Sequence, residues 1–168
     1  MWYHIQKEFI ERLGDLKMVT ALDVANTFLE RGKTDNVIIT PMKIQKLLYI
    51  FYKEYLKETR TKVFEERFET WQYGPVIQEV YDAFKKFRAN PINDFYYYNN
   101  NHYRTVILEK GSDFLRIFDK VWEQYGNLSG IYLSSLTHLP DTAWSKADEA
   151  NRNYLDDNDI ILEATYDV

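Results

Sequence analysis

The segment Thr40–Tyr55, with the sequence TPMKIQKLLYIFYKEY, decides the fold. Thr40 can accept a hydrogen bond from a free N–H group of a helix's first turn. Pro41 suits the first helical position, because the N–H that proline lacks is not needed there. The segment therefore predicts a helix that begins at Pro41, with one apolar face formed by Ile44, Leu47, Leu48, Phe51 and Tyr55.

Four residues of this segment lie away from that face. Tyr49 and Ile50 make the helix apolar on a second side, which is typical of a helix at the centre of its fold. The alternative is that they contact a partner protein, and we prefer the central position. Gln45 lies partly off the apolar face and Lys46 lies nearly opposite it, so we expect both to be exposed and available to a partner.

Two further helices are predicted before this segment. Thr20, with Asp23 three positions later, resembles a capping box and opens a helix that Gly32 ends. Residues 2–13 also carry apolar side chains at helical spacing, with Gly14 as a stop. We therefore expect residues 1–19 to be an N-terminal helical extension and residues 20–168 to be a single domain.

Strand signals appear after the central helix. Residues 57–67 are charged and mixed in sign, which predicts a solvated connection, and Phe68–Tyr73 is rich in strand-forming residues. We expect Gly74-Pro75 to break that strand and Pro75 to start a helix. Residues 93–103 predict a turn or hairpin, and Tyr103–Leu108 a second strand that pairs with the first.

The C-terminal part predicts further helices. Ser112, either Asn127 or Ser129, and Asp141 are the expected N-caps, and residues 157–168 fit a helix or a strand. The predicted fold class is mainly α: a compact helical domain with a small antiparallel β-hairpin.

Composition excludes several classes of function. The 168 residues fit one domain, and the absence of cysteine excludes disulfides and thiolate metal sites. The three histidines lack ligand spacing, so no zinc or other cofactor is expected. A net charge of −5 argues against non-specific nucleic-acid binding. The longest apolar run, Leu47–Tyr52, is far too short to span a membrane, and the N-terminus lacks a signal-peptide core, so we expect a cytoplasmic protein.

His138 is the best candidate for acid–base chemistry, since Ser134, Ser135 and Asp141 lie nearby in the sequence. Catalytic triads are assembled by the fold and not by sequence proximity. We therefore prefer the interpretation that His138 hydrogen-bonds to backbone at a helix end.

Two charged clusters have alternative interpretations. Asp156, Asp157 and Asp159, with Glu149 nearby, could bind a hard cation but lack calcium-loop spacing, so we prefer a solvated acidic turn. Lys85, Lys86 and Arg88, with Tyr96–Tyr98 downstream, could bind nucleic acid. The lysines also suit the C-terminal end of a helix, which we prefer.

Four segments of the sequence form an ordered set: Ala21–Ala25 with Phe28-Leu29, Ile39–Tyr49, Phe68–Val76 with Val80-Tyr81, and Leu136–His138 with Trp144 and Ala147. Taken together, they resemble the Panacea domain of SocA-like and phage-associated GepA-type antitoxins. A departure from the family pattern is Thr142-Ala143, where we would expect proline just before Trp144.

The resemblance implies a non-enzymatic antitoxin that neutralises a toxin by binding it, the toxin usually being encoded by a neighbouring gene. In the SocA-like case it also implies delivery of the toxin to a protease. Alternatives are a nucleic-acid-binding regulator, a proteolytic adaptor and, ranked last, a hydrolase. The motif residues either mark the fold, which we prefer, or contact the partner: Thr40, Pro41, Lys43, Gln45, Lys46, Tyr49, Trp71, Tyr73, Gly74, Pro75, His138 and Trp144.

Overall fold

The computed structural model describes residues 6–10 and 18–168. Within these ranges the chain is mainly α-helical with a minor β component, as predicted. The helices are α1 (Ala21–Asp35), α2 (Pro41–Thr59), α3 (Gln78–Phe84), α4 (Asp113–Tyr125), α5 (Gly130–Thr137), α6 (Ala143–Glu149) and α7 (Asp157–Leu162). The strands are β1 (Gln6–Ile10), β2 (Glu69–Trp71), β3 (Gly74–Val76), β4 (Tyr97–Asn99) and β5 (His102–Val106).

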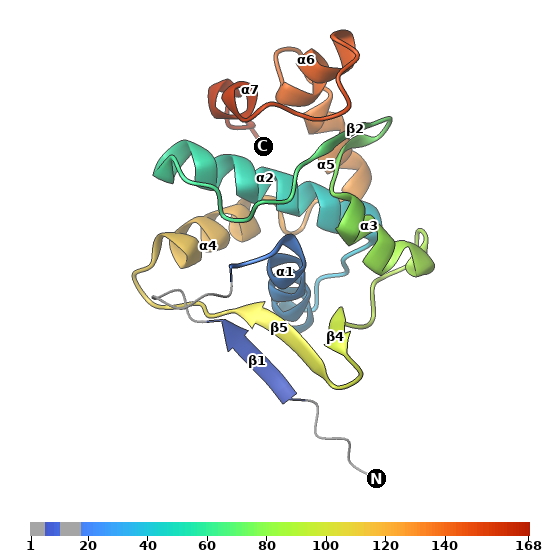
Figure 1. Ribbon diagram of the computed structural model, residues 1–168, viewed down its shortest axis with the longest axis vertical. Helices are drawn as coiled ribbons and strands as arrows, with labels where there is room; N and C mark the ends of the chain where they lie inside the picture. The colour runs from blue at the N-terminus through green and yellow to red at the C-terminus, as the bar shows by residue number, and fades with distance from the viewer. Residues whose placement is uncertain (1–5, 11–17) are drawn as a thin grey trace.

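Helix α2 lies at the centre of the fold, as predicted (Figure 1). It contacts α1, α3, α4, α5, α7 and β3. Thr40 caps it by accepting a hydrogen bond from the Lys43 N–H at 3.3 Å, and Pro41 is its first residue. Tyr49 and Ile50 are both fully buried, so the alternative that they contact a partner is wrong.

Helix α1 begins with the predicted capping box, in which Thr20 and Asp23 each accept a hydrogen bond from the other's backbone N–H. The helix continues past Gly32 to Asp35. Asn36 then ends it in the left-handed conformation, with φ 56°, and donates its N–H to the Gly32 carbonyl. Asn tolerates this conformation better than most residues, and for that reason it supplies the stop.

The strands form two separate sheets, so the predicted pairing between them is wrong. β2 pairs antiparallel with β3, and β4 pairs antiparallel with β5, which confirms the hairpin expected in residues 93–103. Gly74 and Pro75 belong to β3 and do not begin a helix, which starts at Gln78. The Gln45 amide donates to the Ile77 carbonyl and accepts from the Ile77 N–H, which holds Ile77 in an extended conformation, so the helix begins only after it.

A helix was predicted for residues 2–13, and this prediction is wrong for Gln6–Ile10. These residues form β1, which pairs parallel with β5. The sheet order β1-β5-β4 places β1 on the edge of β5 that β4 leaves open. An open strand edge offers unpaired backbone groups, and these can outweigh a helical sequence pattern. Trp2, Ile5 and Leu13 lie outside the described residues, and the boundary at residue 19 stays a prediction.

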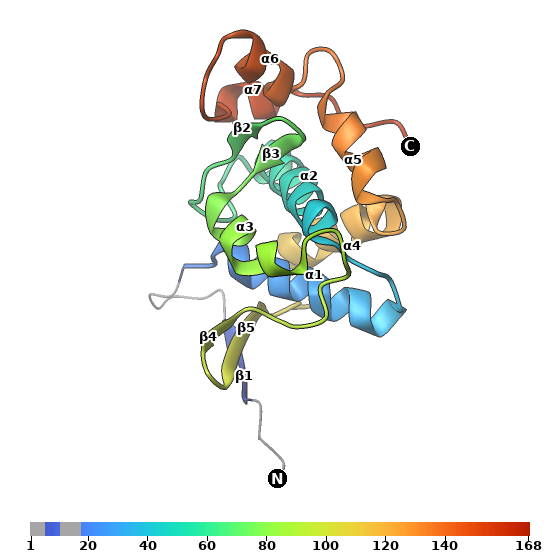
Figure 2. The same cartoon turned by 90° about the vertical axis from the view of Figure 1, so that its right-hand side faces the viewer.

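The remaining segments surround α2. Val63 and Phe64 are buried, so the charged connection after α2 is anchored by two apolar side chains. Ser112, Ser129 and Thr142 cap α4, α5 and α6, whereas Asp141, expected to cap, adopts φ 64° instead. Figures 1 and 2 show α6 and α7 at one end of the molecule and the three-stranded sheet at the other.

Candidate functional site

The β2–β3 hairpin is attached to α2 by Gln45 and Lys46. The Gln45 amide donates to the Ile77 carbonyl at 3.1 Å and accepts from the Ile77 N–H at 3.0 Å. The Lys46 ammonium donates to the Pro75 carbonyl at 2.8 Å. Both side chains are buried, so the expectation that they are exposed is wrong. The hairpin covers the face of α2 that carries Gln45 and Lys46, which the helical periodicity of the sequence predicted to be exposed.

Gly74 lets the hairpin approach two helices closely. It adopts φ 103°, in the left-handed region that favours glycine. A Cβ atom there would lie 2.5 Å from Oγ1 of Thr137 on α5 and 3.0 Å from Cε of Lys46 on α2. Glycine is therefore required by both conformation and space.

His138 fixes the other side of the hairpin. Its Nδ1 lies 2.7 Å from the Ser134 carbonyl and its Nε2 lies 3.0 Å from the Gln72 carbonyl. Its ring packs on Trp144, whose indole N–H donates to the Trp71 carbonyl at 2.8 Å. The preferred interpretation, backbone hydrogen bonding at a helix end, is confirmed. Both ring nitrogens face carbonyl oxygens, so neither is positioned to activate Ser134 or Ser135.

A groove of about 390 Å³ opens between the N-terminal half of α2, the hairpin and α3. Figure 2 shows these three elements side by side. Its walls combine apolar and aromatic side chains with two basic residues, the buried Lys46 and the exposed Arg88, and contain no acidic residue. The lining residues are Pro41, Met42, Gln45, Lys46, Trp71, Gln72, Tyr73, Val76, Val80, Tyr81 and Arg88.

Five of the predicted motif residues line this groove, which brings together two segments distant in the sequence: Pro41, Gln45, Lys46, Trp71 and Tyr73. The other seven do not line it. Thr40 caps α2, Lys43 and Tyr49 are buried, Gly74 and Pro75 form the inner strand, and His138 and Trp144 hold the hairpin from α5 and α6.

Three groove residues were not singled out from the sequence: Met42, Gln72 and Tyr81. Val76 lies in the segment expected to be helical from Pro75 onward, but it belongs to β3. Tyr81 is 40% exposed, and its ring contacts Trp71 edge to face at 4.8 Å between centroids. The only available signal for Tyr81 was its place in a segment that carries the family resemblance.

Burial lowers the pKa of Lys46 from its ordinary value of 10.5 to about 7, because desolvation disfavours the ammonium. Among the described residues, no carboxylate lies within ion-pair distance of Lys46 to offset this effect. The pKa values of Lys43 and Lys53 are also lowered, with desolvation as the largest cause.

We expect the free energy of unfolding to rise between about pH 7 and about pH 10, because the unfolded chain keeps a proton on Lys46 that the folded protein releases. One such group contributes at most ~1.4 kcal/mol per pH unit. Lys46→Met should flatten the rise by roughly 1 kcal/mol per pH unit, measured by urea unfolding. Lys86→Met, at an exposed lysine, should keep the full slope. Equal slopes in all three proteins would contradict this.

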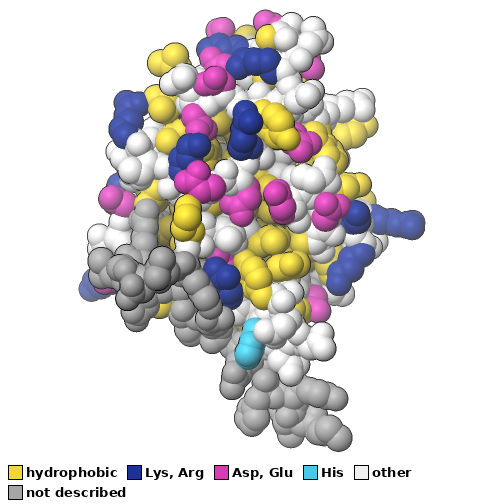
Figure 3. Space-filling view, viewed as in Figure 1, with side chains coloured by type: hydrophobic (Ala, Val, Ile, Leu, Met, Phe, Trp, Pro, Cys, Tyr) yellow, Lys and Arg dark blue, Asp and Glu magenta, His cyan; other side chains and the backbone are white. Residues whose placement is uncertain are grey.

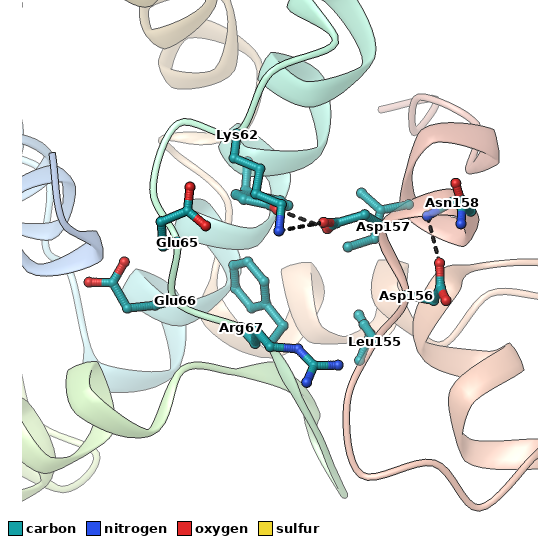
Figure 4. Close-up of a pocket in the computed structure, with 11 residues that line it drawn as sticks. Lys62, Glu65, Glu66, Arg67, Leu155, Asp156, Asp157 and Asn158 are labelled. Atoms are coloured by element: carbon teal, nitrogen blue, oxygen red, sulfur yellow. Dashed lines mark hydrogen bonds and ion pairs between the residues drawn. The ribbon is translucent and has the colours of Figure 1, made fainter. Parts of the chain in front are cut away.

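A second pocket, of about 370 Å³, lies between the α2–β2 connection and the start of α7 (Figure 4). Several of its charged side chains are engaged in contacts within the fold. Lys62 pairs with Asp157 at 3.2 Å, and Asp156 caps α7 by accepting from the Asn158 N–H. Asp159 pairs separately with Arg152. Within residues 6–10 and 18–168, no group of three or more His, Cys, Asp or Glu side chains is arranged to hold a metal ion.

The cluster that could have bound nucleic acid is divided between two roles. Lys85 pairs with Asp82 at 2.7 Å, and Lys86 lies over the Phe87 ring, at the end of α3. The Tyr98 hydroxyl donates to Asp23, which also pairs with Arg104. These contacts tie the tyrosine-rich hairpin to α1.

No helix in the described part of the chain is long and apolar enough to cross a membrane.

Comparison with known proteins places the chain among antitoxins. The sequence profile described as "Antitoxin SocA-like, Panacea domain" matches residues 44–145, which include most of the groove. The protein named Antitoxin SocA, from Caulobacter vibrioides (strain NA1000 / CB15N), is 33% identical over 70 residues. That alignment covers 42% of this chain and 37% of the relative, so the likeness spans little more than a third of the relative's length. No solved structure matches. Because the profile covers more than half of the sequence, the chain belongs to the SocA-like Panacea-domain antitoxin family.

Proposed function

We propose that this protein is an antitoxin that neutralises a cognate toxin by direct protein–protein binding, in a bacterial or phage toxin–antitoxin system. The observation that carries the proposal is the groove itself. Two segments that carry the family resemblance, in α2 and in the β2–β3 hairpin, meet there and leave an aromatic, partly apolar surface open. Exposed aromatic side chains over apolar walls are typical of surfaces that bind proteins.

The ionisable groups support binding over catalysis. His138, the best catalytic candidate, is engaged with two backbone carbonyls. Asp156, Asp157 and Asp159 cap a helix or pair with cations. A catalytic site needs a nucleophile, base or metal that converges on a shared cavity. The groove is lined by no Asp, Glu, His, Ser, Thr or Cys side chain, and within the described residues no group of three or more His, Cys, Asp or Glu side chains is arranged to hold a metal ion.

Co-expression with the product of the neighbouring gene tests the proposal. The neighbour alone should arrest growth, co-expression should restore growth close to that of uninduced cells, and the two proteins should copurify as a stable complex. Burial of about 1,600 Å² in total would be ordinary for such a complex. A neighbour that is harmless alone, or that remains toxic beside this protein, would show the proposal to be wrong.

A further inference from the structure

We infer that the groove between α2, the β2–β3 hairpin and α3 is the surface that contacts the toxin, and that it takes a toxin segment carrying an apolar side chain beside a carboxylate. This inference rests on the proposed function and names the chemistry of the partner. It follows from the shape, charge and backbone conformation of the groove.

The groove offers an apolar wall already held in place. Trp71 packs edge to face against Tyr81, and its indole N–H donates to Glu69 at 2.7 Å, so the ring is fixed. Tyr73, at the hairpin turn, is 61% exposed. Such rigid aromatic side chains lose little conformational freedom when a partner covers them, which favours binding.

The hairpin that forms one wall is anchored at several points. Gln45, Lys46, Ser134 and Trp144 all hydrogen-bond to its backbone or to the residue that follows it. The Ser134 hydroxyl donates to the Tyr73 carbonyl at 2.7 Å, which fixes the backbone of the turn. The Tyr73 side chain stays exposed. The groove is therefore pre-formed and needs little ordering on binding.

The charge of the groove differs from that of the whole chain. The chain has a net charge of −5, and a row of acidic side chains crosses the face seen in Figure 3. The lining residues include Lys46 and Arg88 and no Asp or Glu. Lys46 is buried and donates to the Pro75 carbonyl, so Arg88 supplies the exposed positive charge. Within the described residues, the exposed Arg88 side chain makes no ion pair or hydrogen bond. A guanidinium can bind a carboxylate through two parallel hydrogen bonds. The toxin segment that occupies the groove therefore carries a carboxylate that meets Arg88.

Arg88 also has an unusual backbone. Its φ of 56° and ψ of −118° lie outside the favoured regions for a residue with a side chain. Its N–H donates to the Lys85 carbonyl at 3.1 Å, which ends the short 3-10 helix Lys85–Phe87. Strained conformations of this kind cluster at ligand-binding positions. The strain also supplies a clean test, because Arg88→Gly removes the charge while relieving the backbone.

The test measures the affinity of purified variants for the toxin identified by co-expression. Arg88→Gly should unfold at an equal or higher urea concentration than the unchanged protein, yet bind the toxin about 10- to 100-fold more weakly. Arg88→Glu should bind more weakly still. Lys86→Glu makes the same charge change two residues away, outside the groove, and should change affinity by less than about 3-fold.

The apolar wall is tested separately. Tyr73→Ala should weaken binding about 10-fold or more, since it removes an exposed aromatic contact. Tyr132→Ala removes a tyrosine on α5 that is 45% exposed and does not line the groove, and should bind like the unchanged protein.

The outcomes separate the two proposals. If the unchanged protein neutralises the toxin while Arg88→Gly, Arg88→Glu and Tyr73→Ala all bind it normally, the groove is not the contact surface but the antitoxin function stands. An equal loss of affinity in Arg88→Glu and Lys86→Glu would show that binding depends on long-range electrostatics and not on a direct contact with Arg88. If the unchanged protein fails to neutralise its neighbour's product, the proposed function itself fails, and the groove assignment with it.

Discussion

Glu163→Ala is expected to lower the free energy of unfolding by about 3–5 kcal/mol, the range for breaking a buried charge network by removing one partner. The Glu163 side chain is buried where the chain after α7 meets α2. Its Oε2 accepts from the Tyr49 hydroxyl at 2.5 Å and from the Ala143 N–H at 2.8 Å, and its Oε1 accepts from the Tyr166 hydroxyl. One carboxylate thus joins three elements of the fold.

The loss is large because Glu163 also balances a buried cation. The Lys53 ammonium is fully buried and lies 3.6 Å from Oε1 of Glu163, with Glu54 slightly farther away at 3.8 Å. Without Glu163, this ammonium loses its nearer carboxylate, and the Tyr49 and Tyr166 hydroxyls lose their acceptor. Desolvation and the nearby Glu163 charge raise the pKa of both tyrosines, so they remain protonated donors.

Urea unfolding followed by circular dichroism measures this effect. Glu163→Gln keeps an acceptor oxygen and the side-chain shape, so its loss should be smaller than that of the alanine variant. Glu123→Ala, at an exposed position on α4, should change stability by less than about 0.5 kcal/mol. A loss below about 1 kcal/mol for Glu163→Ala would mean that the network contributes little to holding the C-terminal segment.

Gly74→Ala is expected to cost about 2–4 kcal/mol, since it adds overpacking to backbone strain. The new methyl group would meet Oγ1 of Thr137 at 2.5 Å and Cε of Lys46 at 3.0 Å while φ stays at 103°. The hairpin must then move away from α5 or α2. We therefore also expect weaker toxin binding, because the hairpin forms one wall of the groove.

Gly111→Ala is the matched control for this variant. Gly111 has φ 86°, also in the left-handed region, but an added Cβ would meet no atom within 4 Å. Its cost should be only that of the conformation, about 1–2 kcal/mol. Equal losses of stability at the two glycines would contradict the close packing of the hairpin against α5 and α2.

Local signals predicted the helix starts well. Thr40-Pro41 and the Thr20–Asp23 capping box act within one helical turn, so the sequence contains the whole interaction. The central position of α2 was also predicted, since Tyr49 and Ile50 are apolar outside the main stripe and a second side of the helix had to be buried. The hydrogen bonding of His138 at the end of α5 followed from its position before Pro140.

Non-local contacts explain the errors. Gln45 and Lys46 looked exposed because their partners, Ile77 and Pro75, lie about thirty positions later and accept or donate through the backbone. Gly74-Pro75 looked like a helix start because sequence does not show that Gly74 packs against Thr137. Residues Gln6–Ile10 have a helical pattern, yet the open edge of β5 draws them into a sheet. The groove arises from these same contacts, so its outline could not be predicted from sequence.

Titration of the purified toxin with this protein tests the central claim most directly, namely that the molecule acts by covering another polypeptide and not by catalysis. Toxin activity should fall in proportion to the antitoxin added and reach zero at a fixed whole-number ratio, while the intact mass of the toxin stays unchanged. Complete inactivation by a small fraction of that amount, or a changed toxin mass, would contradict the account.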